Sequence, residues 1–135
     1  FIRLGDEVAP VTVSGRTSAI LRKDARTLRA ARLASPVIRL LPNFDSYLLG
    51  HDRKDHLVDA EHYKRVYRKA GWLSPVVLVD GRVVGVWSYE RKGRRLRVRV
   101  EPFGKLPRAV REGVEAEAQD IARYFESSEE VTFAS

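Results

Sequence analysis

Three arginines alternate with apolar residues in the segment that ends at Val100. Arg95, Arg97 and Arg99 occupy every second position, and leucine or valine stands at the positions between and after them. Side chains of a β-strand change sides with every residue, so this pattern predicts a strand with one arginine face and one apolar face. Successive guanidinium groups would stand about 6.6 Å apart, close to the spacing of phosphates along a nucleic-acid strand. The chemistry that these residues offer is phosphate binding.

More basic residues lie on both sides of this strand. From Gly81 to Arg111 there are ten lysines and arginines against two acids, whereas the segment after Arg111 has seven acids and one arginine. A local basic block within a chain of net charge +7 favours a polyanionic partner such as nucleic acid. We expect a surface that binds double-stranded DNA, with an affinity that falls steeply with salt. Its predicted residues are Arg91, Lys92, Arg94, Arg95, Arg97, Arg99, Lys105 and Arg108.

Two interpretations of this basic block remain open. In the first, the turn at Lys92-Gly93 is a hairpin tip that enters a groove of DNA. In the second, it is an ordinary exposed turn beside a solvated face, whose arginines pair with the acidic helix expected from Glu112 to Glu126. Tyr47, Trp72, Trp87 and Tyr89 can stack on a base, although we expect Trp87 and Tyr47 to lie in the core.

Catalytic, metal and cofactor sites are not predicted. The chain has no cysteine, and the spacings of its three histidines, at positions 51, 56 and 62, do not match a helical metal pair. No glycine-rich phosphate loop occurs. Asp45 is expected to cap nearby backbone N–H groups or to pair with Arg53, because no second acid or base can be assigned to it.

The strands expected around the arginine strand form hairpins. Val76–Val79 and Val83–Tyr89 are joined at Asp80-Gly81, where glycine accepts the positive φ of a tight turn. The other predicted strands are a hairpin within Glu7–Leu21 that turns at Ser14-Gly15, the strand Val37–Leu41, and Val131–Phe133, which would close the sheet.

Helices are expected in four places. The first is Ala25–Ala34, with Asp24 as its cap and Leu28 facing inward, and the second is one turn within Phe44–Gly50. The third follows Asp59 and has Tyr63, Val66, Tyr67 and Ala70 on one face. The fourth is Pro107–Glu126. Gly113 within the last helix would mark a close packing contact, because glycine costs about 1 kcal/mol there relative to alanine. Together these elements predict an α+β fold: a small, strongly curved antiparallel sheet or β-barrel with two or three flanking helices and no parallel strand–helix–strand unit.

Three segments resemble the C-terminal part of the bacterial winged-helix DNA-binding-domain family, which includes alkylpurine and interstrand-crosslink DNA glycosylases. They are RLLPNFDSYLLGHDR from Arg39 to Arg53, PVVLVDGRVVGVW from Pro75 to Trp87, and the long acidic helix after Leu106. The resemblance implies winged helices before a β-barrel, with a barrel hairpin and basic surfaces on DNA. It also implies a water-holding Gln-x-Gln pair ahead of the barrel. Gln119 is the only glutamine here, so these residues would form a DNA-holding module without catalytic residues.

The organisation of the chain follows from its length and composition. At 135 residues it fits one domain, residues 1–135. It has no methionine and begins with Phe1, so we expect a C-terminal fragment whose winged-helix domains precede it. No membrane-spanning or secretory segment is visible, and a cytoplasmic location is expected. The alternative function is a non-catalytic structural or protein-interaction barrel that binds an acidic partner surface or the parent's own N-terminal domain.

Overall fold

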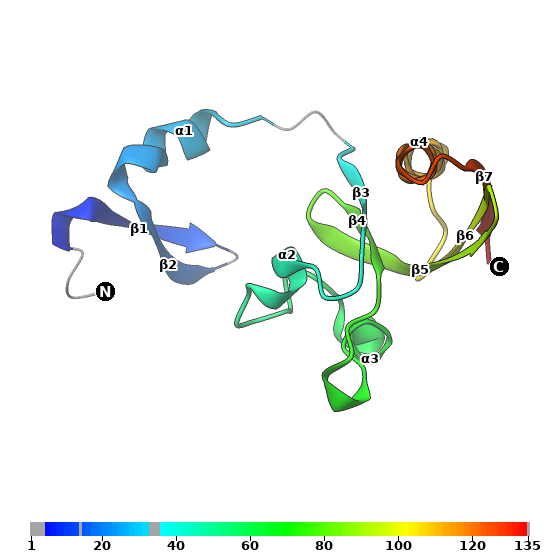
Figure 1. The fold of residues 1–135 in the computed structure, drawn as a ribbon. Helices are drawn as coiled ribbons and strands as arrows, with labels where there is room; N and C mark the ends of the chain where they lie inside the picture. The colour runs from blue at the N-terminus through cyan, green and yellow to red at the C-terminus, as the bar shows by residue number, and fades with distance from the viewer. Residues whose placement is uncertain (1–4, 14, 33–35, 135) are drawn as a thin grey trace. The chain divides into compact units, whose positions relative to one another are not determined.

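The computed structural model describes residues 5–13, 15–32 and 36–134 (Figure 1). Its contacts divide the chain into two compact units, Phe1–Ala34 and Ser35–Ser135. The single domain expected over residues 1–135 stays a prediction, and each unit is described by itself. Within the described residues no helix is both long enough and apolar enough to cross a membrane.

The first unit contains the predicted hairpin. After the short 3-10 helix η1 (Gly5–Glu7), strand β1 (Val8–Val13) pairs antiparallel with β2 (Arg16–Leu21). Gly15 has φ +76° in the turn between them, a conformation that glycine adopts without steric cost, and Ser14 lies outside the described residues. The hairpin predicted within Glu7–Leu21 is confirmed.

The helix of the first unit differs from its prediction. The 3-10 turn η2 (Arg22–Asp24) leads into α1 (Ala25–Ala30), which is shorter than expected. Because of that turn, Asp24 already has helical backbone angles, and its side chain caps no N–H group. Leu28 is exposed rather than inward, since no described element of this unit covers it. Leu33 and Ala34, the end of the predicted helix, lie outside the described residues.

The second unit is built on a five-stranded sheet with the order β3-β4-β5-β6-β7. The strands are β3 (Ile38–Leu41), β4 (Val76–Val79), β5 (Arg82–Lys92), β6 (Arg95–Pro102) and β7 (Ser128–Phe133). Asp80 and Gly81 both have positive φ, 48° and 85°, which is the two-residue turn predicted there. In the second hairpin the last paired residues are Lys92 and Arg95, so the turn consists of Gly93 and Arg94, one residue later than predicted. Of these two residues, Gly93 has positive φ.

The sheet is open and mixed, which corrects the expected antiparallel sheet or barrel. β7 pairs parallel with β6, and helix α4 (Arg108–Tyr124) connects the two strands. The 17 residues of α4 span about 24 Å, close to the roughly 23 Å spanned by the eight residues of β6, so the helix returns the chain to the start of β6. The predicted absence of a parallel strand–helix–strand unit is therefore wrong. β3 and β7 are the two edges, and no barrel closes in the described part of the chain.

One face of this sheet packs against α4 (Figure 1). The buried residues of the helix are Val110, Val114, Ala118 and Ala122, which meet Leu96, Val98 and Val100 of β6. A Cβ on Gly113 would lie 2.4 Å from Ile38 Cδ1 of β3, so the close contact predicted at this glycine is confirmed. Pro107 takes the cap position with extended angles, and the helix begins at Arg108.

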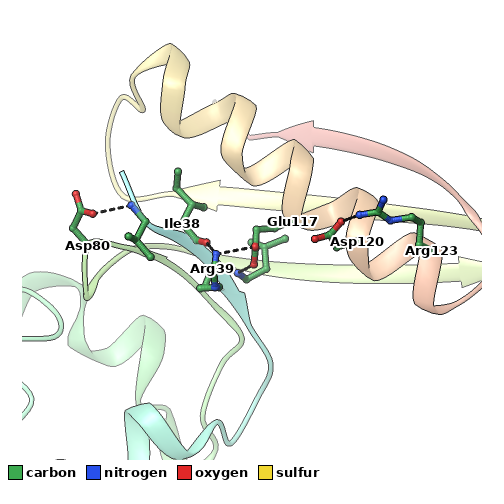
Figure 2. A network of polar contacts seen from close by, with 8 residues as sticks. Ile38, Arg39, Asp80, Glu117, Asp120 and Arg123 are labelled. Atoms are coloured by element: carbon green, nitrogen blue, oxygen red, sulfur yellow. Dashed lines mark hydrogen bonds and ion pairs between the residues drawn. The ribbon is translucent and has the colours of Figure 1, made fainter. Parts of the chain in front are cut away.

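Polar contacts attach the edge strand β3 to its neighbours (Figure 2). The Glu117 carboxylate of α4 accepts hydrogen bonds from Arg39 Nη1 at 3.1 Å and from Leu40 N at 3.2 Å. Asp80 Oδ1 accepts a bond from Val37 N at 2.8 Å on the β4 side. Glu117 thus occupies a backbone donor on the free edge of the sheet, where unpaired N–H groups invite association.

The opposite face of the sheet, at the β4 end, carries a second apolar cluster. Leu48 of α2 (Ser46–Leu49) and Val66 of α3 (Tyr63–Val66) pack there with Leu57, Val58, Leu73, Val76, Leu78 and Val83. Asp45 caps α2 by accepting a 2.8 Å bond from Tyr47 N, as predicted. Tyr47 itself is not a core residue: it is partly exposed, and its hydroxyl donates to Gly81 O of the first turn.

The helix predicted after Asp59 is broken into short pieces. α3 lies between two 3-10 turns, η3 (Ala60–His62) and η4 (Lys69–Gly71), and Ala70 has φ 57°. Tyr67 leaves the helix because it forms a β-bridge with Leu73. Asp59 caps nothing, since its carboxylate binds Arg82 at 2.6 Å instead. The described residues contain an α-helical segment in each of the four predicted places, one or two more than the two or three flanking helices of the expected fold class.

Candidate nucleic-acid interface

The predicted arginine strand is β6, and its alternation is confirmed. Leu96, Val98 and Val100 are fully buried against α4, while the side chains of Arg97 and Arg99 are 51% and 63% exposed on the other side. We call this other side of β5, β6 and β7 the arginine face. Cross-strand pairing adds Lys92, Glu90 and Ser88 of β5, which lie opposite Arg95, Arg97 and Arg99.

Carboxylates interrupt the arginine face, in contrast to the purely basic surface predicted from the sequence. Arg97 Nε lies 3.1 Å from Glu130 Oε2 of β7, and Arg99 Nε lies 3.5 Å from Glu101 Oε1. Arg97 and Arg99 thus pair with acids of the sheet itself, whereas the alternative interpretation placed their partners on the acidic helix. Exposed pairs of this kind contribute about 0–1 kcal/mol, so a phosphate can replace the carboxylate at small cost.

The hairpin tip carries the least compensated charges. Among the described residues Arg94 and Arg95 have no ion-pair partner, whereas Lys92 Nζ lies 3.3 Å from Glu90 Oε1. Arg91 points to the α4 side, where its guanidinium lies 5.3 Å from the ring centre of Phe125. The arginine face therefore includes Arg95 and excludes Arg91, while Arg94 lies in the turn itself.

Lys105 and Arg108 are not part of the same surface as the tip. They follow the far end of β6, which has eight residues and therefore spans about 23 Å. Arg108 is paired with Glu112 in the first turn of α4 at 2.7 Å. The eight predicted DNA-binding residues thus separate into three groups: five on the arginine face and its tip, Arg91 on the α4 side, and the distant pair Lys105 and Arg108.

Two side chains of the described residues have shifted pKa values, and neither belongs to the arginine face. Burial, followed by the charges of His56 and Lys54, lowers the pKa of His51, and burial with the neighbouring Tyr63 raises the pKa of Tyr67 to about 12. The Tyr67 hydroxyl already donates to Leu48 O at 3.1 Å. Gln119 is exposed on α4. In the described ranges no three His, Cys, Asp or Glu side chains lie close enough together to hold a metal ion.

Comparison with known proteins identifies the family. The family model of AlkZ-like DNA glycosylases matches residues 2–124. The chain belongs to this family. An interstrand DNA cross-link repair glycosylase of Streptomyces sahachiroi is 46% identical to this AlkZ-like chain over 121 residues, which are 89% of the chain and 31% of the relative.

A solved structure agrees with this assignment. The DNA glycosylase AlkZ of Streptomyces sahachiroi is 41% identical and has a TM-score of 0.79, over 98% of this AlkZ-like chain and 35% of that protein. The chain spans about a third of the length of these relatives. The resemblance to DNA glycosylases is therefore confirmed, while winged helices in a preceding segment stay a prediction.

Proposed function

We propose that this chain is the part of an AlkZ-like DNA glycosylase that holds double-stranded DNA, and that the arginine face binds the phosphate backbone. One observation carries the proposal. Three guanidinium groups repeat on alternate residues of one strand, on the side of the sheet that α4 leaves uncovered. Their spacing of about 6.6 Å lets one arginine row follow one strand of DNA.

The ion pairs of the face rank its members. Arg95 is unpaired among the described residues, so its charge is fully available to a phosphate. Arg97 lies opposite Glu90 and binds Glu130, which makes its contribution the smallest of the three. Arg94 at the tip extends the same surface toward a groove, where arginine responds mainly to groove shape. Lys105 and Arg108 would contact a separate stretch of backbone.

The activity of the whole protein follows from the family. The relative's description names interstrand DNA cross-link repair, and we propose the same substrate class, cross-linked DNA, for the protein that contains this chain. The residues that hydrolyse the N-glycosidic bond would then lie outside these 135 residues, on the winged helices expected to precede this chain. A cytoplasmic location is part of this proposal.

A second function has one observation in its favour. The carboxylates of Glu90, Glu101 and Glu130 give the arginine face a mixed charge, which is matched by a protein surface that carries acids opposite the arginines and bases opposite these carboxylates, such as a surface of the parent's own N-terminal domain. Burial of the arginine face in such a contact within the longer protein would make the face insensitive to added DNA.

Fluorescence anisotropy with a labelled duplex tests the proposal. Replacing Arg95, Arg97 and Arg99 by glutamine should weaken binding and reduce the slope of log K against log salt by about 2.7, because each lost phosphate contact removes about 0.9. The matched control replaces Lys23, Arg26 and Arg29, three exposed cations of the first unit, with the same loss of charge. Equal affinity and slope for the two triple variants would contradict the proposal.

A further inference from the structure

A second basic surface lies beside the arginine face, and it includes an exposed tryptophan. A groove of about 450 Å³ runs between α3 with the loop after it and the outer side of β5 and β6. Residues that line it include Lys64, Arg65, Arg68, Trp72, Ser88 and Glu101. None of the basic residues was predicted as a site, because they are separated from the arginine strand by 27 or more residues of sequence.

The groove continues the arginine face. Ser88 lies opposite Arg99 in the sheet, and both residues belong to the arginine face. Glu101 joins the two surfaces, because its Oε1 lies 3.5 Å from Arg99 Nε and its Oε2 lies 3.6 Å from Arg65 Nη2. A backbone that follows the arginines of β6 therefore reaches the cations of the groove without leaving this side of the sheet.

Two cations of the groove are available for a ligand. Lys64 and Arg68 are exposed and have no ion-pair partner among the described residues. Arg65, by contrast, is held by Glu101 and by the ring of Phe103, whose centre lies 4.6 Å from its guanidinium. The groove thus offers two uncompensated charges beside one that is fixed in place.

The tryptophan is held in place while half of it stays exposed. Trp72 is 50% exposed, and the ring of Phe44 packs against it edge-to-face with centroids 5.1 Å apart. Both rings lie at or near unusual backbone: Phe44 has φ 60°, and Ala70, two residues before the tryptophan, has φ 57°. A bulky residue rarely takes such angles, and they concentrate at ligand-binding sites.

We propose that this groove binds an unpaired nucleotide of DNA, with its base stacked on Trp72 and its phosphates on Lys64 and Arg68. A positively charged groove with an exposed aromatic ring is the arrangement by which proteins hold single-stranded nucleic acid. The inference rests on the proposed function, because the duplex part of the same DNA would lie along the arginine face. Cross-linked or damaged DNA that has lost pairing next to the lesion supplies such a nucleotide.

Three DNA ligands separate the contributions: a blunt duplex, the same duplex with a five-thymidine extension, and the same duplex with an abasic extension of equal length. The thymidine extension should strengthen binding about tenfold over the blunt duplex, because stacking of a base on an aromatic ring adds to the phosphate contacts. The abasic extension keeps the phosphates and should give only part of this gain. Tryptophan fluorescence should be quenched by the thymidine ligand alone.

Variants assign the two parts of the gain. Trp72→Ala should bind the thymidine and abasic ligands equally, and Trp72→Phe should restore part of the difference. Lys64→Gln with Arg68→Gln should weaken both extensions. The controls are Tyr124→Ala, which removes an 83% exposed aromatic ring outside the groove, and Arg53→Gln with Lys69→Gln, which removes the same charge from exposed positions that do not line it.

The other possible results decide between the groove proposal and the proposed function. If the duplex binds but the thymidine extension adds nothing, the groove proposal is overturned and the proposed function stands. If no DNA binds, both fail. Unchanged base-dependent gain in Trp72→Ala, with blunt-duplex binding intact as proof of folding, also overturns the inference. So does displacement of the thymidine ligand by a polyglutamate peptide at equal charge concentration, since this would indicate an acidic protein partner.

Discussion

Substitution of Gly113 by alanine tests how closely α4 packs on the sheet. The new Cβ would lie 2.4 Å from Cδ1 of Ile38, far inside the 3.5–4.0 Å of a favourable carbon contact. Ile38 is buried in the core between β3 and α4, so its side chain has little room to move away. The substitution also removes a glycine from a helix interior, which by itself stabilises by about 1 kcal/mol.

The two effects oppose each other, and the second substitution Ile38→Val separates them. Overpacking costs about 1–3 kcal/mol, so Gly113→Ala alone should destabilise by about 1 kcal/mol after the helical gain. Valine lacks Cδ1, and the nearest Ile38 atom is then Cγ1, 3.2 Å from the new Cβ. Ile38→Val alone should cost about 0.5–1.5 kcal/mol. On that background Gly113→Ala should be neutral or stabilising by up to about 1 kcal/mol.

Urea unfolding followed by circular dichroism measures all four proteins of this cycle. The expected coupling energy is about 1–2 kcal/mol, within the range for residues in direct contact. DNA affinity serves as the internal control, because the contact lies on the α4 side of the sheet and the arginine face lies on the other. Stabilisation by Gly113→Ala in both backgrounds would refute the close packing of α4 on β3.

Three further predictions concern His51, Gly85 and Tyr67. The pKa of His51 is lowered in the folded protein, so the unfolded state binds more protons just below pH 6.5. The free energy of unfolding should therefore fall as the pH drops through that range. Urea titrations at pH 7.5 and 5.5 should show a flatter pH dependence for His51→Gln. Gly85→Ala should destabilise by more than about 2 kcal/mol in the same assay, because its Cβ would meet Glu101 O of the β6 backbone at 2.9 Å, and backbone cannot rotate away. Tyr67→Phe should remove the phenol absorbance change near pH 12 and cost about 1 kcal/mol through the lost bond to Leu48 O. An unchanged pH dependence, a neutral Gly85→Ala, or persistence of the late phenol titration would contradict the respective argument.

Local chemistry made several features predictable from the sequence. Asp80-Gly81 has the two positive φ values that the turn needs, and Asp45 caps α2 because its side chain reaches an N–H two residues on. The alternation of β6 fixed which residues lie on the arginine face. Glu90 on that face was also predictable, since a two-residue turn after Lys92 places it opposite Arg97.

Long-range features were not predictable in the same way. The parallel partner of β6 is Ser128–Phe133, whose short and polar start resembles a loop, and its register places Glu130 beside Arg97. Asp59 looked like a helix cap, but Arg82, 23 residues later, takes its carboxylate. Lys105 and Arg108 were grouped with the tip by their closeness in sequence, although β6 carries them about 23 Å away.

The parallel crossover, which the sequence analysis missed, decides which side of the sheet is free for DNA. A strand–helix–strand connection must place its helix on one face of the sheet, and α4 meets the side of β6 that carries Leu96, Val98 and Val100. The α2–α3 layer covers the opposite face only around β4 and β5. The arginine side of β6 is thus left uncovered near the hairpin tip and is bordered by α3 near Glu101. The groove with Trp72 lies at that border. An antiparallel hairpin to β7 would have needed no helix over β6, and the apolar side of β6 would then have lacked its cover.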